Sequence, residues 1–376
     1  MKTVRLIKQM VFGILTVAAL WGTSCPVHAG TLHSVAYLQK HASEADDYSD
    51  SDQKNFEAEL EKDGFVKLVK GETYHLGKTT LQSGWKIDAT GATIYGSGNY
   101  GFFDHKRTKT NYGSLSNVVI KGGKWLSESK NGYLKTLIHF THAQNIKLQD
   151  MYIKATNYEG HTVELVACKN VTIENCTILP KGKSSADCAE EQIQIDVAAA
   201  STYPALKGTK LANGGVCKKI TIKNCTVKGS RAICANSTIG DGKKPNKCHS
   251  GITIKNCKLT GENGEALALF DTSNAVVKGN KIITKSPLSR DSYSIGCHFH
   301  IFGTDKSSEK GKITVTNNTI KGGRQAFQVY SHSNVLFGTV VLKNNKLYCK
   351  RGAENAILAD CYKKFLNQNN KLHNWS

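Results

Sequence analysis

The chain has 376 residues and a formal net charge of +20 at pH 7, and Lys supplies most of its cations because only six Arg occur. Recognition of nucleic acids favours Arg, and no nucleic-acid motif is present, so we expect no nucleic-acid partner. A basic chain of this kind is better suited to an acidic polymer such as an anionic polysaccharide or a cell-wall glycan. Alternatively, the Lys side chains keep exposed strands soluble and block edge pairing.

Residues 1–29 have the pattern of a secretory signal peptide. Lys2, Arg5 and Lys8 precede an apolar run over 11–21, and a small-residue cleavage site ends at Ala29. The run is shorter than the roughly 18 residues that cross a bilayer, and no second run of that length follows, so we expect no membrane span. The sequence therefore predicts a secreted, extracellular protein that begins near Gly30 and keeps a charge of about +17 after losing those three cations.

A short unit recurs eight times along the chain. Its clearest copies contain Val-Thr-Ile-Glu-Asn-Cys-Thr-Ile at 170–178, Ile-Thr-Ile-Lys-Asn-Cys-Thr-Val at 219–227 and Ile-Thr-Ile-Lys-Asn-Cys-Lys-Leu at 251–259. Apolar residues alternate as in a strand, and an Asn or Gly then supplies a tight turn. The other copies cover 117–125, 145–153, 274–282, 312–320 and 339–347.

A second short strand accompanies most of these units. Two or three short strands per turn of roughly 25 residues are typical of a parallel β-helix, whereas a propeller blade needs about 40 residues or more. We therefore expect an all-β solenoid that forms one domain over 30–376, with rungs over about 65–361 and a helical cap over about 45–64 at the open end. The second strands are expected at 137–141, 163–167, 193–197, 232–236, 267–271, 299–303, 327–331 and 356–360.

The cysteines fall at two kinds of position. Cys176, Cys225 and Cys257 occupy the same place in their repeats, beside a predicted ladder of stacked Asn, and small buried thiols explain them better than disulfides do. The mature chain would hold 11 of the 12 Cys, so at least one stays unpaired. Secretion permits disulfides, and the candidate loop pairs are Cys188–Cys217, Cys234–Cys248 and Cys349–Cys361.

Three segments carry a family resemblance. Gly-Glu-Thr-Tyr at 71–74, Ile-Asp-Ala-Thr-Gly-Ala-Thr-Ile at 87–94 and the repeated Val-Thr-Ile-Glu-Asn-Cys-Thr-Ile resemble the pectate-lyase-like superfamily of right-handed parallel β-helix proteins. The resemblance covers about residues 55–361 and is specific for fold but loose for activity, because the superfamily includes polysaccharide lyases, glycoside hydrolases, uronate epimerases and phage tailspikes. It implies a substrate groove along the outer face of one parallel sheet, flanked by long loops.

Alignment of the second strands predicts which side chains line that groove. Alternation turns Val163, Leu165, Ile193 and Ile195 inward and the residues between them outward. One outward ladder is then His139, Glu164, Gln194, Cys234, Ala268, His300 and Gln328. A second ladder, two residues further along, is Thr141, Val166, Asp196, Asn236, Phe270, Phe302 and Tyr330.

Polar residues concentrate on three of these rungs, beside the insertions at 179–190 and 198–218. Strand geometry places Glu164 and Asp196 roughly 8 Å apart at the backbone. This separation suits an acid/base pair for glycoside hydrolysis of the inverting type, although tilted side chains could lie closer. We expect Glu164 and Asp196 to be that pair, with His161 and Glu191 as further catalytic candidates. The alternative is that these carboxylates are solvated charges on an exposed sheet.

The substrate-binding candidates are four residues of these ladders, Gln194, His139, His300 and Tyr330, and Arg231, which opens the strand after Asp196. Arg231 could neutralise a uronate carboxylate or form an ion pair with Glu191, and the sequence favours neither. A separate ladder on the other sheet is basic and could bind an anionic polymer lengthwise or form a solvated face. It consists of Lys121, Lys223, Lys255, Lys278 and Lys343.

Signatures of named activities are missing. The Asn-Thr-Asp, Asp-Asp, Gly-His-Gly and Arg-Ile-Lys set of polygalacturonases does not occur, and neither does the calcium-binding Asp set of pectate lyases. We therefore expect no metal or cofactor, with calcium, which no motif supports, as the alternative. Our leading hypothesis is a secreted carbohydrate-active enzyme that cleaves an acidic or cell-surface polysaccharide by carboxylate acid/base chemistry. The alternatives are a polysaccharide lyase or uronate epimerase, and a non-catalytic glycan-binding or adhesive β-helix. The sequence predicts neither the sugar nor the oligomeric state.

Overall fold

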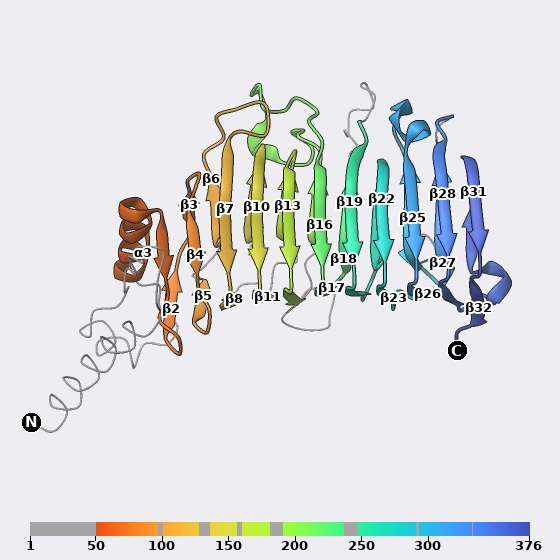
Figure 1. Ribbon diagram of the computed structural model, residues 1–376, viewed down its shortest axis with the longest axis horizontal. Helices are drawn as coiled ribbons and strands as arrows, with labels where there is room; N and C mark the ends of the chain where they lie inside the picture. Colours follow the sequence, from red (N-terminus) through yellow and green to blue (C-terminus); the bar gives the residue numbers. More distant parts are fainter. Residues whose placement is uncertain are drawn as a thin grey trace, which may run out of the picture.

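The computed structural model is an elongated solenoid in which three parallel sheets run the length of the molecule (Figure 1). Each turn of the chain adds one strand to sheet A, one to sheet B and one to sheet C, in that order. The fold is the right-handed parallel β-helix that the sequence predicts. The structure describes residues 50–96, 101–127, 136–155, 160–180, 191–236, 247–290, 293–332 and 334–376.

The three sheets have 11, 11 and 10 strands. Sheet A contains β1 (Phe65–Lys67), β4 (Lys86–Asp88), β7 (Leu115–Lys121), β10 (Ala143–Gln149), β13 (Lys169–Glu174), β16 (Lys218–Lys223), β19 (His249–Lys255), β22 (Thr272–Lys278), β25 (Lys312–Thr316), β28 (Phe337–Lys343) and β31 (Tyr362–Gln368). Sheet B contains β2 (Thr73–Leu76), β5 (Thr93–Gly96), β8 (Lys124–Ser127), β11 (Tyr152–Ala155), β14 (Thr177–Pro180), β17 (Thr226–Gly229), β20 (Lys258–Gly261), β23 (Lys281–Thr284), β26 (Thr319–Gly322), β29 (Lys346–Cys349) and β32 (Lys371–Asn374). Sheet C contains β3 (Thr79–Leu81), β6 (Phe103–His105), β9 (Ile138–Thr141), β12 (His161–Val166), β15 (Glu191–Asp196), β18 (Arg231–Asn236), β21 (Leu267–Phe270), β24 (Ile295–Ile301), β27 (Gln325–Ser331) and β30 (Ile357–Ala359).

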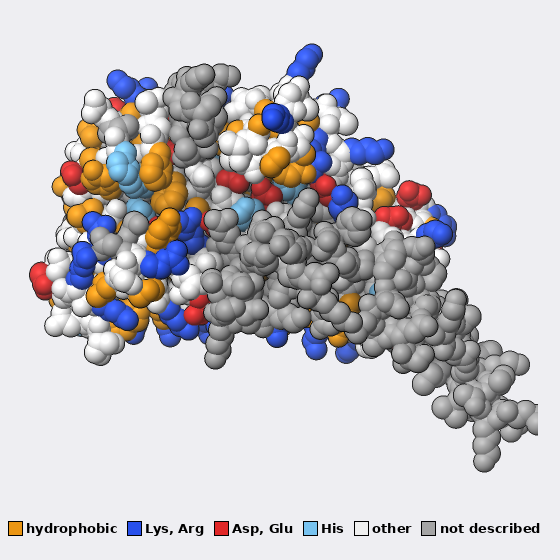
Figure 2. Space-filling view, turned by 180° about the vertical axis from the view of Figure 1, so that it is seen from behind, with side chains coloured by type: hydrophobic (Ala, Val, Ile, Leu, Met, Phe, Trp, Pro, Cys, Tyr) orange, Lys and Arg blue, Asp and Glu red, His pale blue; other side chains and the backbone are white. Residues whose placement is uncertain are grey.

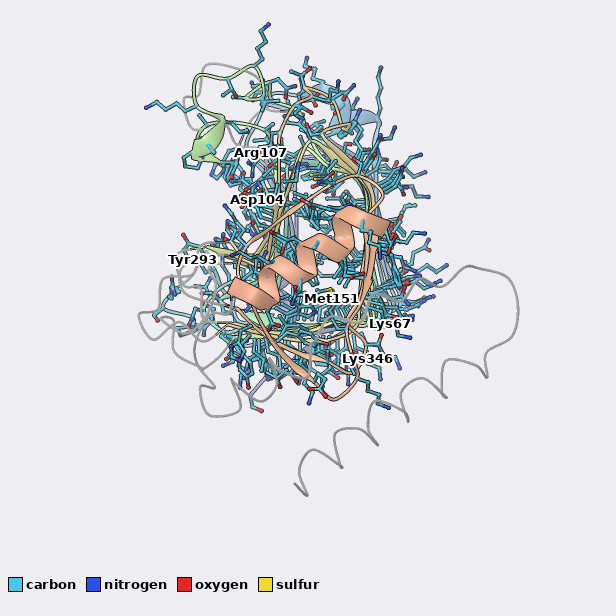
Figure 3. The ribbon with its side chains drawn as sticks, turned by 90° about the vertical axis from the view of Figure 1, so that its left-hand side faces the viewer. Lys67, Asp104, Arg107, Met151, Tyr293 and Lys346 are labelled. Carbon is cyan, nitrogen blue, oxygen red and sulfur yellow. The ribbon has the colours of Figure 1, made fainter. Side chains whose placement is uncertain are left out.

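Helical segments are few and short. The 14-residue helix α3 (Asp50–Asp63) lies across the N-terminal end of the solenoid, where Phe56 and Leu60 are fully buried (Figure 3). It is the cap that the sequence predicts, and the part of the expected range before residue 50 lies outside the described residues. The described ranges contain the 3₁₀ helices η2 (Pro204–Leu206), η4 (Lys306–Lys310) and η5 (Ala353–Asn355).

A two-residue turn joins each long strand of sheet A to the following strand of sheet B. Its first residue has a positive φ of 55° at Asn175 and Asn224 and 54° at Asn256. Asn tolerates this left-handed conformation better than other residues with a side chain. The predicted amide ladder is present in these rungs, because Nδ2 of Asn224 donates to Oδ1 of Asn175 at 3.2 Å and Nδ2 of Asn256 donates to Oδ1 of Asn224 at 3.4 Å.

The second residue of the turn points into the solenoid. In three rungs it is Cys176, Cys225 and Cys257, which are buried and stacked, with the backbone N–H of Cys176 donating to Sγ of Cys225 at 3.4 Å. In the next four rungs the same place holds Asn, and these amides bond to one another: Asn280, Asn318, Asn345 and Asn370. The interior ladder therefore changes from thiols to amides part-way along the molecule.

Two expectations about chain organisation are corrected. The rungs do not stop near residue 361, because β31 and β32 pair with β28 and β29 and extend the solenoid to Asn374. The weak repeat in this last rung, with Asn at both turn positions but polar residues around it, hid it from the sequence pattern. All ten cysteines in the described part of the chain are free thiols. Cys234–Cys248 and Cys349–Cys361 are therefore not disulfides, and Cys188 lies outside the described residues.

The predicted signal peptide, 1–29, also lies outside the described residues. Among the residues that are described, no helix is long and apolar enough to cross a membrane.

Candidate active site on sheet C

Neighbouring strands of sheet C bring the predicted polar residues together. In the register of the sheet, Glu164 on β12 stands beside His139 on β9 and Gln194 on β15. Val163 and Leu165 point into the core, so alternation directs Glu164 outward. His161, Glu191 and Arg231 form a parallel ladder at the start of the same strands, as the shared pairing of β12, β15 and β18 requires.

The outward side chains are nevertheless buried. Glu164 is 3% exposed and Asp196 is 2% exposed, whereas the sequence predicted an open sheet face. A reason is visible in the insertion after β15, whose Tyr203 ring stacks on His139 at a centroid distance of 4.0 Å. Arg107 holds Tyr203 in turn, because its guanidinium lies 4.7 Å from the ring centroid and donates to the phenol oxygen at 2.7 Å.

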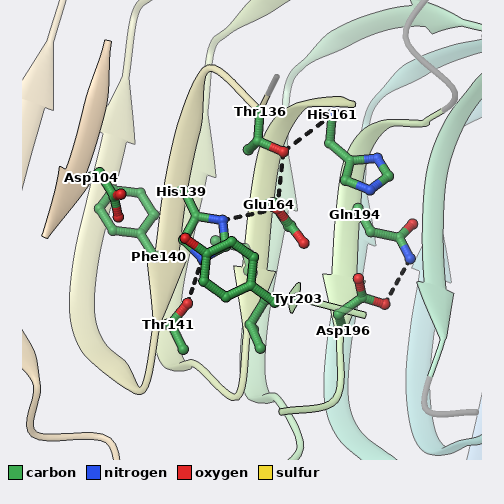
Figure 4. A network of polar contacts seen from close by, with 12 residues as sticks. Asp104, Thr136, His139, Phe140, Thr141, His161, Glu164, Gln194, Asp196 and Tyr203 are labelled. Atoms are coloured by element: carbon green, nitrogen blue, oxygen red, sulfur yellow. Dashed lines mark hydrogen bonds and ion pairs between the residues drawn. The ribbon is translucent and has the colours of Figure 1, made fainter. Parts of the chain in front are cut away.

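Two carboxyl groups and an imidazole form the centre of the site (Figure 4). His161, Glu164 and Asp196 each offer one polar atom, and these atoms lie within 4.8 Å of one another. The two carboxyl groups are thus closer than the backbone spacing predicted, because their side chains tilt together. Figure 2 shows acidic and His side chains gathered near the middle of this face of the molecule.

Each carboxyl group has one oxygen held and one oxygen without a partner among the described residues. Oε2 of Glu164 accepts from Oγ1 of Thr136 at 2.9 Å and contacts Nδ1 of His139 at 2.8 Å. Oδ1 of Asp196 accepts from Nε2 of Gln194 at 2.8 Å. His139 Nε2 is hydrogen-bonded to the hydroxyl of Thr141, which fixes its ring. The remaining oxygens, Oε1 of Glu164 and Oδ2 of Asp196, are available for chemistry.

The pKa values of the two carboxyl groups are shifted in opposite directions. Burial raises the pKa of Asp196 well above its ordinary value, and the nearby negative charge of Glu164 raises it further. Burial also acts to raise the pKa of Glu164, but His139 and His161 outweigh it and the pKa of Glu164 is lowered. At neutral pH Glu164 is therefore ionised, and the raised pKa of Asp196 favours its protonated form.

A chain of ion pairs continues from this centre. Nδ1 of His161 lies 3.2 Å from Oε2 of Glu191, and Arg231 contacts Glu191 through Nη1 and Glu265 through Nε, both at 2.9 Å. Although burial acts to lower it, the pKa of His161 is raised to about 9 by Glu191 and the other nearby carboxylates, so the ring carries a positive charge at neutral pH. Burial acts to raise the pKa of Glu191, yet His161 and Arg231 lower it.

Arg231 is therefore held between two carboxylates, which matches the ion-pair alternative of the sequence analysis. Glu265, which the sequence analysis missed, extends the chain of ion pairs to His298, where Oε1 lies 3.2 Å from Nδ1. Glu265 lies in the connection between β20 and β21, where strand alternation gives no prediction.

A second cluster of rings lies further along sheet C. His300 stacks on Phe302 with centroids 4.0 Å apart. Phe270 and Tyr330 meet His300 edge-on, and His332 lies tilted against it with centroids 4.5 Å apart. We call these five residues the aromatic patch. Phe302 is 40% exposed, so the patch reaches the surface. Burial together with neighbouring His298 and His332 lowers the pKa of His300 to about 3, so this ring is neutral.

The position of His300 differs from the prediction. His298, not His300, stands beside Ala268 and Gln328, whereas His300 stands beside Phe270 and Tyr330 in the second ladder. The strand β24 begins earlier than expected, at Ile295. Because a shift by two residues leaves every side chain on its original face, the alternation alone could not reveal the error.

The donor set of the centre has the composition of a cation site. One imidazole nitrogen and two carboxylates are ligands that a divalent cation can use. On the same strand as Asp196, Oε1 of Gln194 is buried and has no hydrogen-bond partner in the described part of the chain. Calcium, however, prefers six to eight oxygen ligands, and the carboxylates at the centre supply too few for it on their own. The residues therefore fit calcium poorly.

No family model and no curated protein matches the chain. Among solved structures it is similar to PfbA, a surface adhesin of Streptococcus pneumoniae, with 15% identity over 92% of this chain and 93% of that chain and a TM-score of 0.57. A second structure of that adhesin has 14% identity over 92% and 99% of the two chains and a TM-score of 0.56. An exopolygalacturonase from Thermotoga maritima has 11% identity over 93% of each chain and a TM-score of 0.49.

At these identities the comparisons show the fold alone. That fold is the right-handed parallel β-helix, as the sequence resemblance implies.

Proposed function

We propose that the protein is a carbohydrate-active enzyme that hydrolyses a polysaccharide on the outer face of sheet C. The observation that carries this proposal is the buried pair Glu164 and Asp196, whose polar atoms lie within 4.8 Å and whose pKa values move in opposite directions. Pairs of carboxyl groups with separated pKa values are how glycosidases divide the acid role from the base role.

The chemistry follows from the two protonation states. Asp196, whose raised pKa favours the protonated form, donates its proton to the glycosidic oxygen as the bond to the anomeric carbon breaks. Glu164, held ionised, bonds to the anomeric carbon as the leaving group departs, because carboxyl groups this close leave no room for a water between them. A water that gives a proton to Asp196 then displaces Glu164 from that carbon and restores both groups. The products are two shorter glycans, and one water molecule is consumed.

The surrounding residues act on this pair as positioning groups. His139 and Thr136 orient Glu164, and Gln194 orients Asp196. His161 adds a positive charge that keeps Glu164 ionised, Glu191 holds His161 in its charged form, and Arg231 keeps Glu191 ionised. Charged groups that are fixed before the substrate arrives stabilise the transition state without reorganising.

The length of the polar face favours a polymeric substrate. Three strand spacings separate β15, which carries Asp196, from β24, which carries His300, and this is about 14 Å along the solenoid. A glycan that reaches from the carboxyl pair to the aromatic patch would stack a sugar ring on Phe302 or Tyr330. The likeness to a bacterial surface adhesin and the signal-like pattern of residues 1–29 support a substrate outside the cell.

The proposal is tested with Glu164→Gln and Asp196→Asn, which remove one ionisable group each and keep its shape. Each change should lower glycan turnover by about 10²- to 10⁴-fold, because general acid/base groups contribute this much. Glu174→Gln is the matched control, since Glu174 is an ion-paired carboxylate on sheet A. Turnover is measured on a panel of acidic and neutral polysaccharides, with mass analysis of the products and circular dichroism to verify folding.

Product chemistry decides between the alternatives. Products that gain one water per cut support hydrolysis, whereas an unsaturated, ultraviolet-absorbing end would show a lyase and refute the proposal. If a chelator abolished turnover and a divalent cation restored it, His161, Glu164 and Asp196 would act as metal ligands and not as the acid/base pair. Full activity in the Glu164→Gln protein would also reject the assignment.

A further inference from the structure

A basic surface lies at the corner between sheets A and B. The last outward residues of sheet A strands include Lys223, Lys255, Lys278 and Lys343, which the strand register aligns in one row. The first residues of sheet B strands include Lys258, Lys281, Lys346 and Lys371, which form a second row across the turn. We call these eight residues the Lys strip.

Seven of these eight lysines have no ion-pair partner among the described residues, and Lys223 alone contacts a carboxylate, Glu174 at 2.5 Å. Lys255, Lys258, Lys278 and Lys281 are all exposed. The turn residues between the rows, such as Asn256 and Gly279, are uncharged. Apart from Lys223, the Lys strip has no ion-paired carboxylate among the described residues, and it is interrupted at one rung, by Thr316 and Thr319.

The row of like charges destabilises the folded protein unless a bound anion compensates it. Strands in a sheet lie about 4.8 Å apart, so ammonium groups on neighbouring rungs repel one another directly. The six rungs from β16 to β31 span about 24 Å. Stacked positive charge along a straight edge attracts a linear polyanion and raises its local concentration.

The chemistry of the strip favours an acidic glycan over a nucleic acid. All eight residues are Lys, which acts as a point charge, whereas base recognition relies on the forked guanidinium of Arg. The other corner positions in these rungs hold Thr, Asn and Gln, so none of these positions carries an aromatic ring that could stack on bases. The site on sheet C lies on another side of the solenoid: in Figure 3, Lys346 lies at the lower right, away from Asp104 and Arg107.

We propose that the Lys strip binds a linear acidic polysaccharide lengthwise, independently of the site on sheet C. Carboxylate or sulfate groups along the glycan would contact Lys pairs on successive rungs. The surface would hold the protein on an anionic glycan matrix, and it needs no catalytic residue to do so.

The test replaces Lys255, Lys258, Lys278 and Lys281 with Thr. The rung formed by β25 and β26 already has Thr316 and Thr319 at these two positions, so Thr is compatible with the fold. The matched control replaces four other exposed lysines of sheet A, each with no ion pair among the described residues, and thus changes the net charge equally: Lys86, Lys218, Lys312 and Lys364.

Binding to a heparin dodecasaccharide is measured by calorimetry from low to physiological salt, with neutral dextran and a 20-base-pair DNA duplex as comparisons. The strip variant should bind heparin about tenfold or more weakly than the unaltered protein, and its affinity should depend less steeply on salt. The control should stay within about twofold. The two-residue variant Lys278→Thr with Lys281→Thr should lie between them.

Equal weakening in the control would show that net charge alone drives binding and would overturn the proposal. Unchanged binding in the strip variant, or tighter binding of DNA than of heparin at the same salt, would also overturn it. The experiment measures no turnover, so its outcome is separate from that of the acid/base assignment. Circular dichroism and the melting temperature verify that each variant is folded.

Discussion

Glu164 and Asp196 show how position alone can give two similar carboxyl groups different chemistry. Both are almost fully buried and both come from sheet C, one strand apart. Two imidazoles, His139 and His161, compensate the charge of Glu164, whereas Asp196 has only the amide of Gln194 as a hydrogen-bond partner among the described residues. The same burial therefore leaves one carboxylate ionised and drives the other toward its neutral form.

The raised pKa of Asp196 predicts a stabilising substitution. A group whose pKa is higher in the folded than in the unfolded chain contributes stability below its unfolded pKa, and this is lost as pH rises through its folded pKa. At neutral pH, the Asp196→Asn protein should therefore unfold at a higher temperature than the unaltered protein. Each unit of pKa difference between the folded and the unfolded chain changes the free energy of unfolding by about 1.4 kcal/mol. Below about pH 4 the two melting temperatures should converge. Melting curves at pH 3.5, 5 and 7 provide the measurement, and a variant that is less stable at pH 7 would contradict the burial argument.

The sequence predicted part of this site, and the rest has identifiable reasons for escaping it. Glu164, Asp196, His161, Glu191 and Gln194 fall on regular strands, where alternation and repeat alignment place each side chain. Tyr203 covers the site from an insertion that has no repeat, and the partners of Tyr203 are set by tertiary packing. A Tyr within a long insertion beside the polar rungs was the only signal that pointed to it.

At the scale of elements, the interior ladder replaces a disulfide framework. Asn318 is the best example of its amide part. Its Nδ2 donates to the carbonyl of Val277 at 3.0 Å and to Oδ1 of Asn345 at 2.9 Å, and its Oδ1 accepts from the backbone N–H of Asn280 at 2.8 Å. Every polar atom of this buried side chain is therefore used, and the ladder ties four successive rungs together.

Asn318→Ala should be strongly destabilising. It leaves the N–H of Asn280 and the carbonyl of Val277 without partners inside the solenoid, and each such group costs about 1–3 kcal/mol. The unfolding free energy should fall by about 3 kcal/mol or more in a denaturant titration. Asn317→Gly is the control, because Asn317 has a φ of 58° and Gly occupies the equivalent turn position at Gly279. A similar loss in both variants would mean that the turn, and not the amide ladder, is the source of stability.

The element scale also shows where repeat alignment succeeds and where it fails. The order Lys121, Gln149, Glu174, Lys223 along sheet A follows directly from the short turn to sheet B, which fixes the register. On sheet C the connections before each strand vary in length, so nothing local fixes where β24 begins. That difference explains why the basic ladder was aligned correctly while the alignment of His300 was wrong by two residues.

At the scale of the whole molecule, stability comes from repetition. Each rung packs on its neighbours, and the core runs from Phe56 under the cap to Phe365 in the last sheet A strand without interruption. In such a solenoid the total stability is approximately the sum of rung and interface terms. Covalent cross-links add nothing to this sum in the described part of the chain, because its ten cysteines are free.

The free thiols predict that the fold is insensitive to reductants. Thermal and denaturant midpoints should be the same with and without a thiol reductant, since no described cross-link exists to be broken. Titration of the unfolded protein with a thiol reagent, without prior reduction, should find at least ten reactive groups. Fewer than ten, or a midpoint that falls on reduction, would reveal a disulfide and contradict the arrangement of the core.

The three continuous sheets also fix the spacing of sites along the molecule in units of one rung. The distance between the carboxyl pair and the aromatic patch can change only by whole rungs, in steps of about 4.8 Å. Duplication or loss of one repeat between β15 and β24 would shift the two sites relative to each other while leaving the contacts within each site intact. Variation in repeat number is therefore a direct route by which solenoids of this kind can be matched to glycans of different length.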